Sequence, residues 1–159
     1  MLTQRLISEA LWLLIGIVVA AAVLAPVLLS QGTPTFVGAN VAIIVGAVFV
    51  IRLLFFHRES PLLAPKWAKG VACIAVVPAL LFTVLAINEV QNLVDAYGFQ
   101  GLFGETAFSE SAIRWGRYVR NELILFASAL IIGLVALPVV LIIALWRQVN
   151  ATQRGAPQP

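Results

Sequence analysis

Four long runs of apolar residues constrain the fold of this chain more than any other feature of its sequence. They span residues 10–29, 37–56, 67–88 and 123–146, and the charges inside them are Arg52 and Lys69. A helix of about 20 residues crosses the ~30 Å hydrocarbon core of a bilayer. Backbone polar groups in lipid are satisfied only in helices or closed barrels, and four runs without polar alternation cannot close a barrel. We therefore expect an all-α integral membrane bundle of four transmembrane helices.

The composition excludes the other broad classes of protein. Hydrophobic residues make up 62% of the chain and charged residues 11%, whereas soluble domains average roughly 45–50% and about 25%. A soluble or disordered chain could not carry this much apolar surface, and the single cysteine excludes a disulfide scaffold. We expect one transmembrane domain over residues 1–149 and a polar tail over residues 150–159.

The distribution of charge predicts the orientation in the membrane. The two tails, together with the connection between the second and third runs and its flanks, carry seven basic residues against two acids: Arg5, Arg52, Arg58, Lys66, Lys69, Arg147 and Arg154 against Glu9 and Glu59. Basic residues accumulate on the cytoplasmic side. We therefore expect both termini in the cytoplasm and the 89–122 connection outside. Because Glu9 precedes the first run, we expect a retained helix there rather than a cleaved signal peptide.

The long connection between the third and fourth runs has mixed chemistry. Residues 88–95 keep a helical pattern, so the third helix is expected to continue about two turns beyond the bilayer. A glycine-containing stretch over residues 98–104 then interrupts it. Ser109 or Ser111 can cap a short interfacial helix that runs into the fourth transmembrane helix. The aromatic and basic residues of that stretch suit the headgroup region.

Charged residues around this connection form a candidate site with two interpretations. The acids can pair with the arginines and hold the connection as a lid over the outer end of the bundle, which is the interpretation we favour. Alternatively, the planar guanidinium groups bind lipid phosphate or another anion. The cluster consists of Glu89, Arg114, Arg117, Arg120 and Glu122.

Small residues indicate where helices approach one another closely. In lipid, close backbone approach matters more than hydrophobic contact, and Gly38, Ala42 and Gly46 recur every four residues in the second run. A dimerisation face and packing within the bundle both fit this pattern. We favour internal packing, because a four-helix protein needs such faces in any case. The polar residues Asn40 and Thr83 can be satisfied by a neighbouring helix.

Residue types that carry out chemistry are scarce in this sequence. The chain has one histidine, His57, and one cysteine, Cys73, so we expect no haem, zinc or redox site and no nucleophilic pair. Arg52 and Lys69 are expected to extend to the cytoplasmic surface, which leaves no ionisable side chain deep within a run. We accordingly expect no enzyme activity, no cofactor, no metal and no nucleic-acid partner.

Two stretches, residues 88–95 (NEVQNLVD) and 118–123 (YVRNEL), together with the order of the runs, resemble a group of small bacterial four-helix membrane proteins of uncharacterised role. Some members are labelled magnesium/citrate secondary transporters. The resemblance covers most of the chain, and the four-helix architecture is all that we take from it. For the location we expect a bacterial inner membrane. A citrate carrier of the usual kind is far longer and built from repeats, so the transport label is not carried over.

These observations leave three functions open. A non-catalytic structural or accessory subunit of a membrane complex is favoured by the small size, the close-packing faces and the scarcity of reactive residues. The alternative is a small oligomeric secondary transporter or channel for an anion or small solute. An enzyme subunit that uses a partner's cofactor is the least favoured. The expected partners are the lipid bilayer and other membrane subunits or a second copy of the chain.

Overall fold

The structure is a computed structural model that describes residues 2–57, 60–104 and 109–154. Over these residues it contains four long helices, two short 3₁₀ segments and no strand. The long helices are α1 (Leu2–Ser30), α2 (Val37–Phe56), α3 (Lys66–Tyr97) and α4 (Glu110–Arg154), and the 3₁₀ segments are η1 (Pro61–Leu63) and η2 (Phe99–Phe103). All four long helices are apolar and long enough to cross a membrane. The expected all-α architecture, with four helices long and apolar enough to span a membrane, is confirmed.

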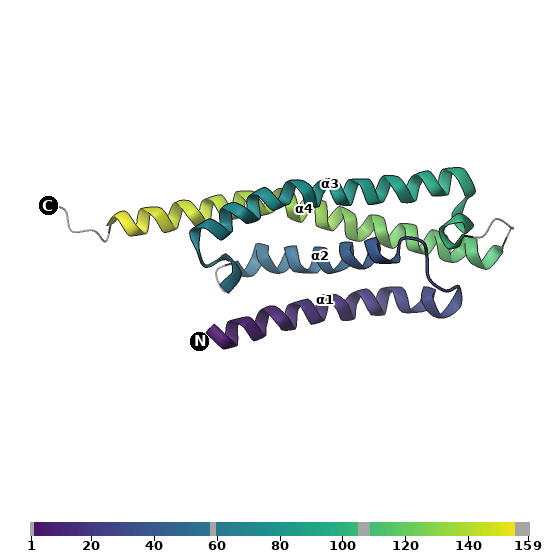
Figure 1. The fold of residues 1–159 in the computed structure, drawn as a ribbon, viewed down its shortest axis with the longest axis horizontal. Helices are drawn as coiled ribbons and strands as arrows, with labels where there is room; N and C mark the ends of the chain where they lie inside the picture. Colours follow the sequence, from purple (N-terminus) through teal and green to yellow (C-terminus); the bar gives the residue numbers. More distant parts are fainter. Residues whose placement is uncertain (1, 58–59, 105–108, 155–159) are drawn as a thin grey trace.

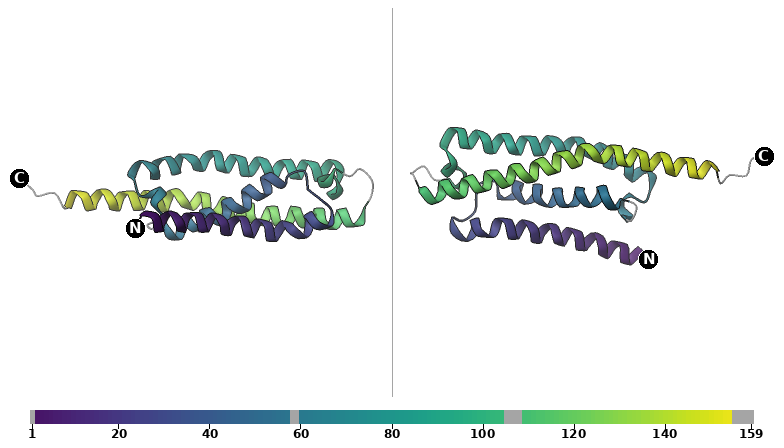
Figure 2. Two further views of the ribbon diagram at one scale, coloured as in Figure 1. Left: turned by 60° about the horizontal axis from the view of Figure 1, so that its bottom comes forward. Right: turned by 180° about the vertical axis from the view of Figure 1, so that it is seen from behind.

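The four helices run alternately in opposite directions, so the first turn of α1 and the last turn of α4 lie toward the same end of the bundle (Figure 1). We call this end the terminal end and the opposite end the loop end. α2 packs against both α1 and α4, and α3 packs against α4. α1 therefore lies at one edge of the bundle, which the further views also show (Figure 2).

α2 is the central helix because it buries residues on two sides. Its main apolar stripe, with residues spaced three or four apart as on one face of a helix, packs against α4. The stripe consists of Ile43, Ala47, Val50 and Leu53, and the α4 residues in the same cluster are Leu123, Ala127, Leu130, Leu134, Leu137 and Leu141. Ile44 faces the other side, where it packs with Ala20 and Leu24 of α1.

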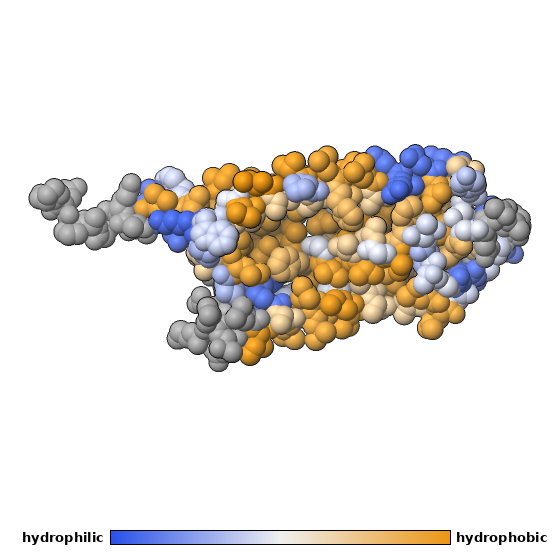
Figure 3. Space-filling model, viewed as in Figure 1, coloured by the Kyte–Doolittle hydropathy of each residue, from blue (hydrophilic) through white to orange (hydrophobic). Residues whose placement is uncertain are grey.

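The outer surface between the two ends of the bundle is apolar. Figure 3 shows a hydrophobic band along the helices, with hydrophilic residues toward both ends. Large hydrophobic side chains remain exposed there, among them Ile74 and Val77 of α3 and Ile132 of α4. Such an extended apolar surface marks contact with an apolar medium or partner. It agrees with the multi-pass membrane protein expected from the sequence.

Of the three small residues that recur every four positions on α2, one lies in a contact between helices. Gly46 lies against α4, where an added Cβ would meet Leu130 at 3.5 Å. Gly38 and Ala42 are exposed, so the packing expected of all three residues is found only at Gly46. The reason is helical geometry: each residue turns the helix by about 100°. Gly38 and Ala42 each lie two positions from buried Asn40 and therefore face away from the core.

The closest approach between α2 and α4 instead involves Gly133 of α4. An added Cβ at this buried glycine would stand 2.6 Å from Cγ1 of Val50 on α2. On α1, Gly16 and Ala20 are both buried, and Gly16 faces Val45 of α2. Small residues on the neighbours of α2 therefore allow the helices to pack at short range.

The stretch expected to form a separate interfacial helix is the beginning of α4. The hydroxyl of Ser109 accepts a hydrogen bond from the backbone N–H of Ala112 at 3.4 Å, as an N-cap does. α4 then continues to Arg154 without interruption. Residues 118–123 contain no glycine or proline that would end a helix there. A separate interfacial helix is therefore not found among the described residues, and α4 also continues past residue 149.

α3 extends past its apolar run, as expected, and ends at Tyr97. Gly98 follows with a φ of 72°, a conformation that glycine adopts without strain. η2 then packs against both α3 and α4. An added Cβ at Gly116 of α4 would overlap the carbonyl group of Phe99, so this glycine lets η2 lie directly on α4.

Candidate functional site

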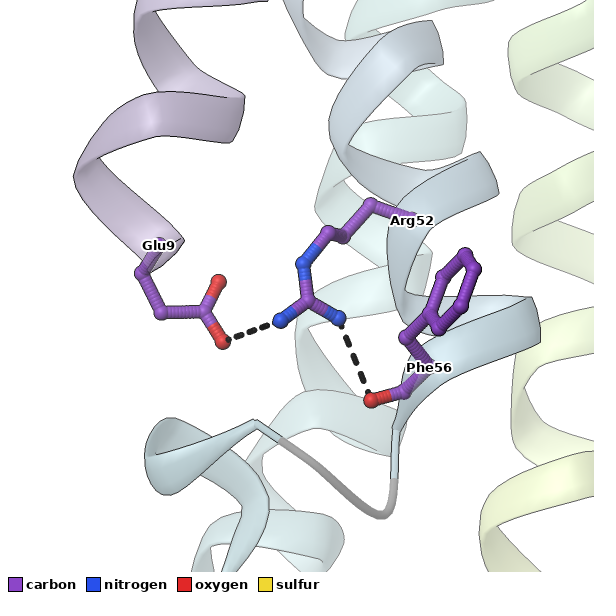
Figure 4. Close-up of polar contacts among 3 residues, drawn as sticks. All are labelled: Glu9, Arg52 and Phe56. Atoms are coloured by element: carbon purple, nitrogen blue, oxygen red, sulfur yellow. Dashed lines mark hydrogen bonds and ion pairs between the residues drawn. The ribbon is translucent and has the colours of Figure 1, made fainter. Parts of the chain in front are cut away.

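An ion pair is buried between α1 and α2 near the terminal end. Arg52 Nη2 donates a hydrogen bond to Glu9 Oε1 at 3.1 Å, and Arg52 Nη1 donates to the backbone carbonyl of Phe56 at 3.1 Å (Figure 4). The Arg52 and Glu9 side chains are 1% and 9% exposed. The expectation that Arg52 extends to the surface is therefore wrong. Glu9 supplies a counter-charge inside the bundle, so the guanidinium group is paired without reaching water.

Aromatic rings complete the surroundings of Arg52. Its Cζ atom lies 6.0 Å from the ring centroid of Trp12 and 5.7 Å from that of Phe56, distances at which cation–π attraction contributes. Glu9 Oε2 and Arg52 Nε are buried and have no hydrogen-bond partner in the part of the chain that the structure describes. The pair is thus held by one ion contact, one backbone bond and two rings.

A second buried polar pair joins α2 to α4 near the loop end. Asn40 Nδ2 donates a hydrogen bond to Glu122 Oε1, and the two residues are 1% and 7% exposed. The amide nitrogen of Asn40 is therefore bonded to a neighbouring helix, as expected, whereas Thr83 donates to the carbonyl of Ala79 in its own helix. Glu122 Oε2 and Asn40 Oδ1 are buried without a partner among the described residues. The pair therefore presents two unsatisfied hydrogen-bond acceptors.

A pocket of about 400 Å³ lies beside the Asn40–Glu122 pair, between α1 and α4. Its lining consists of Val23, Tyr118, Asn121, Glu122, Leu125 and Phe126. The Tyr118 hydroxyl donates a hydrogen bond to the backbone carbonyl of Val23 at 3.1 Å and so links the two helices. Apolar walls with a few polar groups are typical of small-molecule sites. The pocket and the Asn40–Glu122 pair together form the candidate functional site.

Arg120 of the predicted charged cluster contacts α3 through a neutral amide. Its Nε and Nη2 atoms donate to Gln91 Oε1 at 3.2 and 3.1 Å, and Gln91 Nε2 donates to Asp95 Oδ1 at 2.9 Å. Over residues 2–57, 60–104 and 109–154, no ion pair joins the arginines to Glu89 or Glu122. Glu122 lies two positions after Arg120, so it faces α2 while Arg120 faces α3. Glu89 is likewise two positions from Gln91 and is exposed.

Arg114 and Arg117 are exposed and lie against aromatic rings. The Cζ atom of Arg114 is 5.9 Å from the ring centroid of Trp115, and that of Arg117 is 5.6 Å from the ring of Phe99. The structure thus does not bring the five cluster residues together as an ion-pair network within the described chain. Glu105, another acid of this connection, lies outside the described residues. Binding of lipid phosphate by these two arginines stays a prediction.

Backbone and neutral side-chain contacts close the loop end of the bundle. Leu102 of η2 is 1% exposed, and its carbonyl oxygen accepts hydrogen bonds from the Thr35 N–H at 2.9 Å and the Thr35 hydroxyl at 3.1 Å. Gln31 Nε2 donates to Ser111 Oγ at 2.7 Å. The connection between α1 and α2 is thereby attached to η2 and to the start of α4.

Lys69 at the terminal end also turns inward. It is 8% exposed, and its Nζ atom donates to Gln148 Oε1 of α4 at 2.6 Å. Both residues line a pocket of about 470 Å³ together with His57, Leu63, Ala64, Ala144 and Arg147. The expectation that Lys69 extends to the surface is wrong, because α4 continues far enough to offer it a polar partner.

Sequence reasoning identified Asn40 and Glu122 as separate features but not as a pair. Both were visible as polar residues at the margin of apolar runs, and so were Glu9 and Arg52. The sequence carries no signal for their pairing, because Asn40 and Glu122 are 82 residues apart and Glu9 and Arg52 are 43 apart.

Comparison with known proteins finds no matching family model, curated protein or solved structure. The resemblance to small bacterial four-helix membrane proteins therefore rests on residues 88–95 and 118–123. Both stretches take part in the contacts described above, since Gln91 lies in the first and Arg120 and Glu122 lie in the second.

Proposed function

We propose that the protein is a non-catalytic structural or accessory subunit of a membrane complex in a bacterial inner membrane, with both termini in the cytoplasm. The observation that carries this proposal is the apolar packing between the two buried polar pairs. Asn40 and Arg52 are 12 residues apart on α2, which is about 18 Å along a helix. Over that length α2 presents Ile43, Ala47 and Val50 to α4.

This packing supports a scaffold more than a pathway. Conduction of ions or polar solutes uses polar or charged groups along a pore. In the described part of one chain, the Glu9–Arg52 pair and the Asn40–Glu122 pair lie toward opposite ends of α2, with tightly packed aliphatic side chains between them. The polar pairs therefore act as links between helices, which suits a rigid subunit.

The length of α4 supports a role in assembly. With 45 residues, α4 is about 68 Å long at 1.5 Å per residue, against ~30 Å of hydrocarbon. Its C-terminal turns extend beyond the other three helices at the terminal end (Figure 1). An isolated helix end gains no stability from packing. This extension is accordingly the segment that we assign to contact with a partner subunit.

Site-specific crosslinking tests this assignment. A photoreactive amino acid replaces Val149, which is 38% exposed on the extension, and a control variant carries it at Ile74, which is 73% exposed on the outer face of α3. The proposal predicts that Val149 in intact cells crosslinks in high yield to one protein species, identified by mass spectrometry. Ile74 should yield mainly lipid adducts.

Flux measurements separate the proposal from the transporter alternative. The purified protein in liposomes should leave proton and chloride permeability at the level of empty liposomes. Flux that increases with protein content, together with no protein crosslink at Val149, would contradict the accessory role and favour an oligomeric transporter or channel.

A further inference from the structure

We propose that the pocket beside Glu122 binds a primary ammonium group carried on an apolar body. Such a group is found at the head of an ethanolamine lipid and at the end of an alkylamine. The proposal goes beyond the accessory role, since it concerns a ligand site between α1 and α4 that a scaffold does not require.

The first reason is the pair of unsatisfied acceptors. Glu122 Oε2 and Asn40 Oδ1 are buried and have no hydrogen-bond partner among the described residues. A buried acceptor without a donor is unfavourable, and a buried carboxylate without a counter-charge is more so. A primary ammonium group carries a positive charge and three N–H donors, so it can supply the counter-charge and the donor that Glu122, which lines the pocket, lacks.

The second reason is that the two α4 arginines nearest to Glu122 in the sequence, Arg117 and Arg120, are engaged elsewhere. Arg120 donates two hydrogen bonds to Gln91 on α3, and Arg117 lies against the ring of Phe99 in η2. The ion pair found in the described chain joins Arg52 to Glu9 near the terminal end. A positive charge that neutralises Glu122 therefore has to come from a group other than these three arginines.

The third reason is the shape and position of the pocket. It has a volume of about 400 Å³ and apolar walls from Val23, Leu125 and Phe126, which suit a small polar head attached to a hydrocarbon chain. Leu125 is 66% exposed, so the pocket opens on the apolar outer surface. Glu122 directly precedes the apolar run at 123–146, which places it near the boundary between hydrocarbon and headgroups, where lipid ammonium groups lie.

Binding to matched lipids tests the proposal. Native mass spectrometry of the detergent-solubilised chain measures retention of phosphatidylethanolamine and phosphatidylcholine with identical acyl chains. The trimethylated nitrogen of the choline lipid has no N–H to donate. We expect the ethanolamine lipid to bind about tenfold or more tightly, as befits charge-assisted hydrogen bonds. Glu122→Gln should remove this preference, whereas Glu89→Gln, which changes an exposed glutamate at the same end, should retain it.

A second variant and a second ligand keep the outcome clear. Leu125→Trp places a large ring at the exposed edge of the pocket and should block binding while leaving the Asn40–Glu122 pair intact.

Competition by decylamine identifies where the ammonium group comes from. Binding of decylamine without a preference for the ethanolamine lipid assigns the site to a soluble amphiphilic amine. Equal retention of both lipids without decylamine binding overturns the proposal. A lipid preference that survives in both Glu122→Gln and Leu125→Trp overturns it as well.

Discussion

Arg52 is the largest side chain that the bundle buries fully within the described residues. At the scale of single residues, its position shows how a charge is accommodated in an apolar helix pair. Desolvation of two ions is costly, and their attraction offsets that cost only when the geometry is good. The 3.1 Å contact with Glu9, the Phe56 carbonyl and the ring of Trp12 supply this geometry. The pair therefore matters most when one partner is missing.

Removal of either partner should destabilise the protein strongly. Glu9→Gln leaves Arg52 as a buried cation without a counter-charge, and Arg52→Met leaves the Glu9 carboxylate buried alone. Each single change is expected to lower the free energy of unfolding by about 3–5 kcal/mol, measured by thermal or denaturant unfolding in detergent. The double variant should recover part of the loss. Lys66→Met, which removes an exposed cation at the same end, should change little. Single variants as stable as the wild type would refute the role of the pair.

Between helices, the contact of α2 with α4 depends on the absence of a side chain at Gly133. Gly133 brings the backbone of α4 against Val50, whereas Gly46 faces the flexible end of Leu130. Val50 is β-branched and has few rotamers available in a helix, so it cannot move aside. Leu130 can adjust. The two glycines of this contact are thus predicted to respond oppositely to the same substitution.

Substitution of these glycines by alanine tests the packing directly. Gly133→Ala places a Cβ 2.6 Å from Val50 Cγ1 and should destabilise the bundle by about 1–3 kcal/mol, as overpacking does. Gly46→Ala meets Leu130 at 3.5 Å, an ordinary contact, and gains helix propensity of up to about 1 kcal/mol. Gly38→Ala, in open space, is the control. Melting temperatures in one detergent rank the three variants. Recovery of Gly133→Ala by Val50→Ala would identify the clash as the cause.

In the whole molecule, the alternation of the helices places the start of α1, the end of α4 and residues 60–65 at one end. Residues 31–36 and η2 lie at the other end (Figure 1). The apolar band of Figure 3 separates these two ends. The excess of basic residues at the terminal end predicts that this end faces the cytoplasm.

Cysteine labelling tests this orientation. In a Cys73→Ser background, single cysteines are placed at Thr33 and Glu110 at the loop end and at Ala64 and Arg147 at the terminal end, all exposed positions. An impermeant thiol reagent added to intact cells, or to spheroplasts where an outer membrane intervenes, should label the first two. The second two should react only after the membrane is permeabilised. The reverse pattern would show that the charge rule fails for this chain.

Only part of the candidate site could be predicted from the sequence. Asn40 and Glu122 were both recognisable as polar residues beside apolar runs, and Asn40 was expected to need a partner on another helix. Arg120 does not form the expected ion pair with Glu122, because residues two positions apart on a helix point to different sides. Arg120 points toward α3, whereas Glu122 points toward α2. Arg120 donates its hydrogen bonds to the neutral side chain of Gln91 instead.

The number and order of the helices follow from the sequence, because each apolar run has to form a helix in lipid and each run is bounded by polar or glycine-containing segments. Packing settles which polar residues meet, which glycines are buried and where α4 begins. The physical reason is that the lipid-facing side of a transmembrane helix is as apolar as its inner side. The pattern of α2 therefore does not fix the rotation of the helix about its axis, and packing against α1 and α4 does.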